Sequence, residues 1–157
     1  MFTAAMSTAS QPDARPRGIH RAGCVMPATV EAVPLLRRFA LDTAHRWGVG
    51  EQSGEGLAVI VTELVTNVVR HSGSLDVAVL LTTTGRSVTL HVQDTGRWRP
   101  RRPRLPGDDT EACCGRGLRL VRAYAVDCRI VRSARGTRVT ATLAPGDETA
   151  PEAPGAY

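Results

Sequence analysis

The sequence contains no lysine, since all 20 of its basic residues are arginine. It has a single asparagine, Asn67, and only 4% of its residues are aromatic. Ala, Arg, Gly and Pro are abundant while Lys, Asn and Ile are scarce. This pattern indicates a GC-rich coding bias, so the arginine excess is not by itself a binding signal. With so few aromatic residues, the core has to be built from Val, Leu and Ala.

Long apolar runs are also missing. The apolar run 57–61 is typical of the longest runs in the sequence. A membrane span needs about 20 such residues. Residues 1–17 carry no apolar block of the kind found in secretory signals. Four cysteines without a C-x-x-C spacing, and four scattered histidines, argue against a disulfide scaffold and a structural zinc site. We therefore expect a cytoplasmic protein that makes no membrane contact.

A length of 157 residues fits one domain. Composition divides the chain into three parts. We expect a flexible N-terminal tail over 1–26, a folded body over 27–144, and a disordered tail, acidic and rich in proline, over 145–157. The net charge of +5 is modest and would permit an anionic partner.

Hydrophobic periodicity predicts the elements of the body. In order, these are helices over 30–47 and 54–71, strands over 76–83 and 87–93, a long polar loop over 97–114, a helix over 117–125, and strands over 128–132 and 137–143. Hairpins imply antiparallel neighbours. The predicted fold class is therefore α+β, a two-layer α/β sandwich with a mixed, mostly antiparallel sheet and helices on one face.

The second predicted helix carries three polar residues among valines and leucines. Glu63, Asn67 and Arg70 follow the spacing i, i+4, i+7, which places them on one ridge of the helix. An unpaired polar group costs about 1–3 kcal/mol when it is buried. The ridge therefore points either to polar partners in a site or to a solvent-facing stripe, and the spacing leaves both open.

Three further segments are weak signals when each is taken alone. They are Asp94-Thr95-Gly96, Gly115-Arg116-Gly117-Leu118 and Gly136-Thr137. The first places a carboxylate at a strand end, where it could receive a ligand amine or simply form a turn. The second places glycines before a helix, where free N–H groups favour phosphate. The third is compatible with an ordinary hairpin turn.

Taken together, the four segments resemble the motifs of the GHKL (Bergerat-fold) ATPases. The string from Glu63 to His71 resembles their N box, and the three segments above resemble the G1 box, the G2 box and the closing threonine segment. The chain is most similar to the small anti-sigma-factor serine kinases, the RsbW/SpoIIAB-like group, notably those of actinomycetes. The resemblance covers about 28–143 and implies the histidine-kinase-like ATPase fold, with 27–144 as the ATP-binding domain.

The resemblance implies ATP and Mg²⁺ as cofactors and assigns a role to each matching residue. Glu63 would be the catalytic base toward a substrate serine, and Asn67 would hold Mg²⁺ against the phosphates. Asp94 would bind the adenine amino group. The other implied ATP-binding residues are Gly96 and Thr137 beside the adenine, and Arg70, Gly115, Arg116, Gly117 and Leu118 toward the phosphates.

Two positions depart from the family pattern. Trp98 stands where the G1 box usually has a second glycine, and Arg119 stands where many members have another glycine. The arginines between Arg97 and Arg104 are compatible with a solvated loop, a phosphate grip or a docking strip for an acidic partner.

The resemblance also implies protein partners, namely a sigma factor or the antagonist of an anti-sigma factor, and it is compatible with a homodimer. The function it implies is transfer of the ATP γ-phosphate to a serine of the partner. One alternative is an ATP-binding regulator without phosphoryl transfer. Another is a nucleic-acid-binding module, which no helix-turn-helix pattern, zinc finger or aromatic platform supports. We therefore expect no direct contact with nucleic acid.

Overall fold

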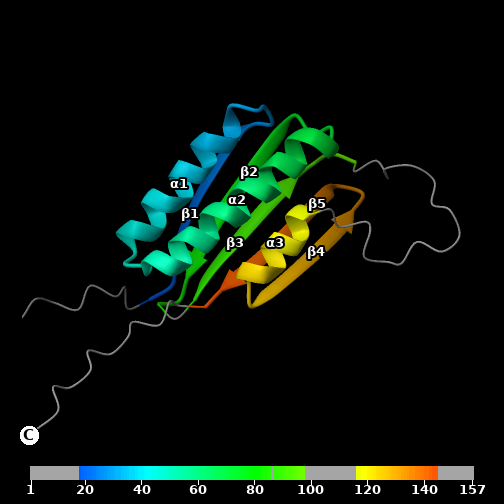
Figure 1. Cartoon of the computed structure of the whole chain (residues 1–157). Helices are drawn as coiled ribbons and strands as arrows, with labels where there is room; N and C mark the ends of the chain where they lie inside the picture. Colours follow the sequence, from blue (N-terminus) through cyan, green and yellow to red (C-terminus); the bar gives the residue numbers. More distant parts are fainter. Residues whose placement is uncertain (1–17, 86, 98–115, 145–157) are drawn as a thin grey trace, which may run out of the picture.

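The computed structural model describes residues 18–85, 87–97 and 116–144 (Figure 1). In chain order its elements are β1 (His20–Pro27), α1 (Ala32–Arg46), α2 (Glu51–His71), β2 (Asp76–Thr83), β3 (Val88–Asp94), α3 (Arg116–Tyr124), β4 (Asp127–Ser133) and β5 (Gly136–Leu143). Periodicity predicts each of them except β1, with shifts of a few residues at the ends. None of the described helices combines the length and apolar content needed to span a bilayer.

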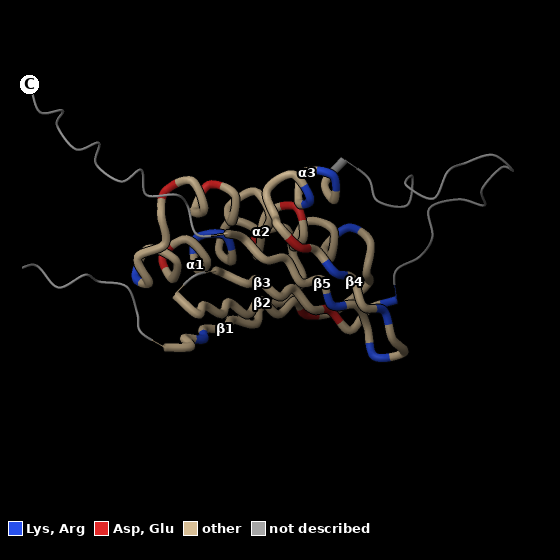
Figure 2. The backbone as a smooth tube through the Cα atoms, turned by 90° about the horizontal axis from the view of Figure 1, so that it is seen from below, with Lys and Arg blue, Asp and Glu red and all other residues tan. Residues whose placement is uncertain are grey.

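The five strands form one sheet in the order β1-β2-β3-β5-β4. The three helices pack on a single face of this sheet (Figure 1, Figure 2). The predicted α+β two-layer sandwich is therefore confirmed. We expected a mixed sheet, but every pairing among the described strands is antiparallel.

Strand β1 corrects the predicted extent of the N-terminal tail. We expected a tail over 1–26, but His20–Pro27 pairs along its whole length with β2. The inward side chains of this edge strand, Ala22, Cys24 and Met26, are only half-buried. They are small or flexible rather than β-branched, so the strand signal in the sequence is weak. Residues 1–17 and 145–157 lie outside the described residues, and their assignment as tails stays a prediction.

Helix α2 lies between α1 and α3 at the centre of the helical layer (Figure 1). It is rich in valine, which is a poor helix former, so burial rather than propensity stabilises it. Its fully buried side chains include Leu57, Ile60, Val61 and Val65. Shortly after its C-terminal end, Gly73 adopts a φ of 65°, the left-handed conformation that often ends a helix.

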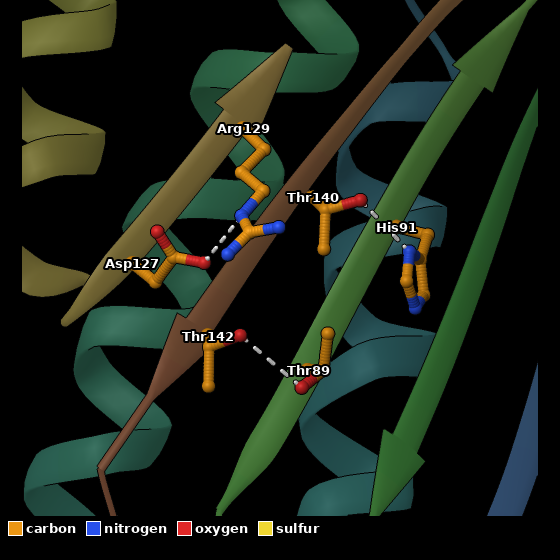
Figure 3. Close-up of polar contacts among 6 residues, drawn as sticks. All are labelled: Thr89, His91, Asp127, Arg129, Thr140 and Thr142. Carbon is orange, nitrogen blue, oxygen red and sulfur yellow. Dashed lines mark hydrogen bonds and ion pairs between the residues drawn. The ribbon is translucent and has the colours of Figure 1, made fainter. Parts of the chain in front are cut away.

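On the face of the sheet that points away from the helices, polar side chains of β3 and β5 bond across the two strands (Figure 3). The hydroxyls of Thr89 and Thr142 lie 3.3 Å apart, and His91 Nδ1 lies 3.0 Å from the hydroxyl of Thr140. Burial, together with the nearby Arg138 guanidinium, lowers the pKa of His91. This shift favours the neutral form of the ring. The helix-facing side chains of the same strands are left to form the core and the site.

Candidate functional site

A pocket lies between the helical layer and one end of the sheet. Its walls come from α2, α3 and the strands β3, β4 and β5. Six lining residues are apolar: Leu64, Val68, Val92, Leu118, Ile130 and Val139. Four are polar: Asn67, Asp94, Arg132 and Thr137. Apolar walls with a few polar groups are the usual composition of a small-molecule site.

Asp94 is the buried acid of this pocket. It is the last residue of β3 and pairs with Thr137 of β5. Only 3% of Asp94 is exposed, and only 5% of Thr137. Its Oδ1 accepts a hydrogen bond from the backbone N–H of Gly96 at 2.9 Å. A carboxylate oxygen can accept more than one hydrogen bond, so this position suits a ligand that brings an N–H donor.

Two glycines allow the backbone to pack closely around Asp94. A Cβ at Gly96 would overlap the carbonyl oxygen of Ser72 and lie 2.7 Å from the backbone nitrogen of Ser74. A Cβ at Gly136 would overlap the carbonyl oxygen of Asp94, and φ at Gly136 is 126°, a conformation that disfavours side chains. The structure thus packs Gly96 against the turn after α2, and its nearness to a ligand ring stays a prediction.

Serine hydroxyls tie that turn to the end of β3. The hydroxyl of Ser74 accepts a hydrogen bond from the backbone N–H of Thr95 at 3.1 Å. The hydroxyl of Ser72 donates to the carbonyl oxygen of Val68 at 2.8 Å. These bonds hold the last turns of α2 in place relative to Asp94. The sequence predicts the two serines only as a helix stop, because nothing in their spacing reveals the contact with β3.

The three polar residues predicted on one ridge of α2 have different surroundings. Asn67 is half-buried and lines the pocket. Glu63 is also half-buried, and its carboxylate lies so close to Gly117 of α3 that a Cβ there would overlap Glu63 Oε2. Arg70 is exposed and is not among the pocket-lining residues. The ridge therefore brings the acid to α3 and the amide to the pocket, whereas the arginine is solvated.

The predicted G2 segment borders the site where the structure describes it. Leu118 lines the pocket and is 7% exposed. Arg116 and Gly117 open α3. Gly115 lies outside the described residues, as do Trp98 and all of the predicted loop over 97–114 except its first residue, so the roles expected of them stay predictions.

Strand β4 contributes two pocket residues that the sequence reasoning missed, Ile130 and Arg132. Both stand on an edge strand and outside all four motifs. Alternation along a strand tells which side chains share a face. That alternation, together with the register set by the short turn between β4 and β5, is the signal that could have placed them beside Thr137 and Val139.

The pocket is narrow, with a cavity volume of about 20 Å³. That is room for about one water molecule. Leu118 and Arg132 stand on α3 and β4, at the border of the fold, where β4 has β5 as its one strand neighbour.

Comparisons with known proteins agree with this architecture. The sequence model of the histidine kinase-like ATPase domain matches residues 26–143. No curated protein matches the chain.

Two solved structures align with the chain. The RsbU and RsbW domains of Rv1364c from Mycobacterium tuberculosis align with a TM-score of 0.62 and 20% identity, covering 80% of this chain and 32% of that chain. A blue-light activated histidine kinase of Erythrobacter litoralis aligns with a TM-score of 0.48 and 19% identity, covering 78% of this chain and 43% of that chain. The chain thus spans less than half the length of either structure, and the first of these likenesses supports a shared fold.

Proposed function

The chain belongs to the family of histidine kinase-like ATPase domains, and on this basis we propose that it binds ATP with Mg²⁺ and transfers the γ-phosphate to a serine of a protein partner. The observation that carries the proposal is the carboxylate of Asp94, 3% exposed, in an otherwise mostly apolar pocket. The amide of Asn67 lines the same pocket. The pocket therefore offers both a hydrogen-bond acceptor for an amine and an oxygen ligand for a cation.

Asp94 and Thr137 form the purine end of the proposed site. The Asp94 carboxylate accepts a hydrogen bond from the exocyclic amine of adenine, while aliphatic side chains of α2 and the sheet enclose the ring. Guanine presents a carbonyl oxygen at the same ring position. Two acceptors would then face each other, so the site favours adenine.

Asn67 and Glu63 form the phosphate end. The Asn67 amide oxygen is a hard ligand that suits Mg²⁺. Bound metal supplies the charge neutralisation that phosphoryl transfer requires. Glu63, one helical turn before Asn67, accepts the proton of the attacking serine hydroxyl. The exposed Arg70 is not required by this arrangement.

We further propose that the partner is a sigma factor or the antagonist of an anti-sigma factor. Two observations support this: the motif resemblance carried by Glu63 and Asn67, and a fold shared with a structure that contains an RsbW domain. A regulator that binds ATP without transferring phosphate would need Asn67 but not Glu63. Substitution of the acid therefore separates the two functions.

Nucleotide binding is expected to stabilise the folded chain. At Mg-ATP concentrations a hundred times the Kd, binding adds about 2.7 kcal/mol, which raises the midpoint of thermal unfolding by on the order of 10 °C. Mg-ADP should act similarly and Mg-GTP should not. Differential scanning fluorimetry measures the shift. No shift with any adenine nucleotide would contradict the proposed function.

The variant Asn67→Ala is expected to abolish the shift with Mg-ATP, because the cation and the phosphates lose their amide ligand. Glu55→Ala is the matched control, since Glu55 is exposed on the same helix and is not part of the pocket. Its shift should equal that of the wild type. A full Mg-ATP shift in Asn67→Ala would remove this residue from the proposed site.

Gly117→Ala is expected to lower phosphoryl transfer at least tenfold while Mg-ATP binding stays close to wild type. The new methyl group would overlap the Glu63 carboxylate and displace it, and small displacements of a catalytic group cost about two orders of magnitude. Gly54→Ala on α2 is the control, because a Cβ there meets nothing within 4 Å. Unchanged transfer in Gly117→Ala would show that Glu63 has room to move aside.

A further inference from the structure

Arg132 contributes to the pocket, although none of the four motifs includes it. Its position follows from the register of the sheet, in which Arg132 of β4 pairs with Thr137 of β5. Side chains of directly paired residues stand on the same face of a sheet. Arg132 therefore lies on the helix-facing side, next to the residue that pairs with Asp94.

The arginines nearest to Arg132 on these two strands have partners, whereas Arg132 has none among the described residues. Arg129 donates to Asp127 at 3.1 Å, and Arg138 donates to Gln93 at 2.8 Å. Within the part of the chain that the structure describes, no hydrogen bond or ion pair holds the guanidinium of Arg132. It is also the single cation among the described pocket-lining residues. Arg132 is exposed, so a charged planar group stands at the mouth of the pocket and is available to a ligand.

We propose that Arg132 is a nucleobase-contacting residue, whose guanidinium lies against the purine and closes the pocket on the side of β4. This inference rests on the proposed binding of ATP. A guanidinium is planar and stacks on aromatic faces, which an ammonium group cannot do in the same way. The aliphatic stem of the side chain extends the apolar wall begun by Ile130.

Its place in the register assigns Arg132 to the base rather than to the phosphates. Thr137 and Asp94 form the purine end of the proposed site, and Arg132 is the neighbour of Thr137 in the sheet. The phosphate end is built from α2 and the start of α3, on the other side of the pocket. A contact with the base and a contact with the phosphates make different predictions for ligands that lack phosphate.

The test is a titration of the full chain with adenosine, Mg-ADP and Mg-ATP by isothermal calorimetry. Arg132→Ala is expected to raise the Kd of all three about fivefold, as for the loss of one cation–π contact. Arg129→Ala is the control, because Arg129 lies on the same strand but on the opposite face. It should bind all three ligands as the wild type does. Equal thermal midpoints without ligand would show that both variants are folded.

Two results would overturn the inference while leaving the proposed function intact. A loss confined to Mg-ADP and Mg-ATP would mean that Arg132 contacts the phosphates. If Arg132→Ala binds all three ligands with wild-type affinity, Arg132 contacts neither the base nor the phosphates. If the wild-type chain itself binds none of the three, the proposed function fails and this inference falls with it.

Discussion

Glu63→Gln is expected to lower the rate of phosphoryl transfer by about 10²–10⁴-fold, the range for loss of a general base. The change keeps the size and shape of the side chain but removes its ability to accept a proton. Because Asn67 and Asp94 are unchanged, Mg-ATP should still bind. Transfer of labelled phosphate from ATP to the cognate antagonist protein measures the rate, and calorimetry measures the binding.

Glu55→Gln is the matched control, because the same chemical change then falls on the exposed part of the same helix. It should transfer phosphate at the wild-type rate. If Glu63→Gln transfers phosphate as fast as the wild type, another group acts as the base. If wild-type protein binds Mg-ATP but labels no serine of its true partner, the chain is an ATP-binding regulator instead of a kinase.

Gly96→Ala is expected to destabilise the fold by about 3–5 kcal/mol, at the upper end for single substitutions. Its Cβ would overlap the Ser72 carbonyl oxygen and crowd the Ser74 backbone nitrogen, so two backbone segments would have to separate. A small domain has only about 5–15 kcal/mol of stability. Much of the population should therefore be unfolded at modest urea concentrations, as followed by circular dichroism.

Gly73→Ala in the same turn provides the comparison. Gly73 has a φ of 65°, but a Cβ there meets nothing within 4 Å. The substitution Gly73→Ala should lower the free energy of unfolding by only about 1–2 kcal/mol, the amount expected for a left-handed backbone alone. The additional loss of stability in Gly96→Ala, relative to Gly73→Ala, then measures the steric clash. A urea midpoint for Gly96→Ala close to that of Gly73→Ala would mean that the contact with the turn relaxes easily.

The helical core was predictable because α2 combines two periodic signals. Its apolar positions repeat at helical spacing, and the polar ridge that interrupts them marks where the site begins. The ridge does not tell how deeply each of its residues is buried. Arg70 shares the face of Glu63, but it stands near the last residues of the helix, where the side chain is exposed. Periodicity gives the angle of a residue around a helix, while its burial depends on where the neighbouring elements end.

The parts that could not be predicted depend on register. Strand β1 has few strand-forming side chains, and its pairing with β2 is what defines it. Arg132 reaches the pocket because it pairs with Thr137 across the short β4–β5 hairpin. The turn sets that register, but no motif marks Arg132 as a pocket residue. Backbone pairing between distant segments carries little sequence signature, so residues placed by it escape motif reasoning.

The pairing of β3 with β5 also has a kinetic consequence. Asp94 and Thr137 belong to segments far apart in the sequence, and they become neighbours only when these two strands join. Closing so long an intervening chain is entropically slow. A ligand that contacts both Asp94 and Thr137 can therefore bind only after β3 and β5 have paired. We expect such a ligand to lower the unfolding rate while leaving the refolding rate unchanged.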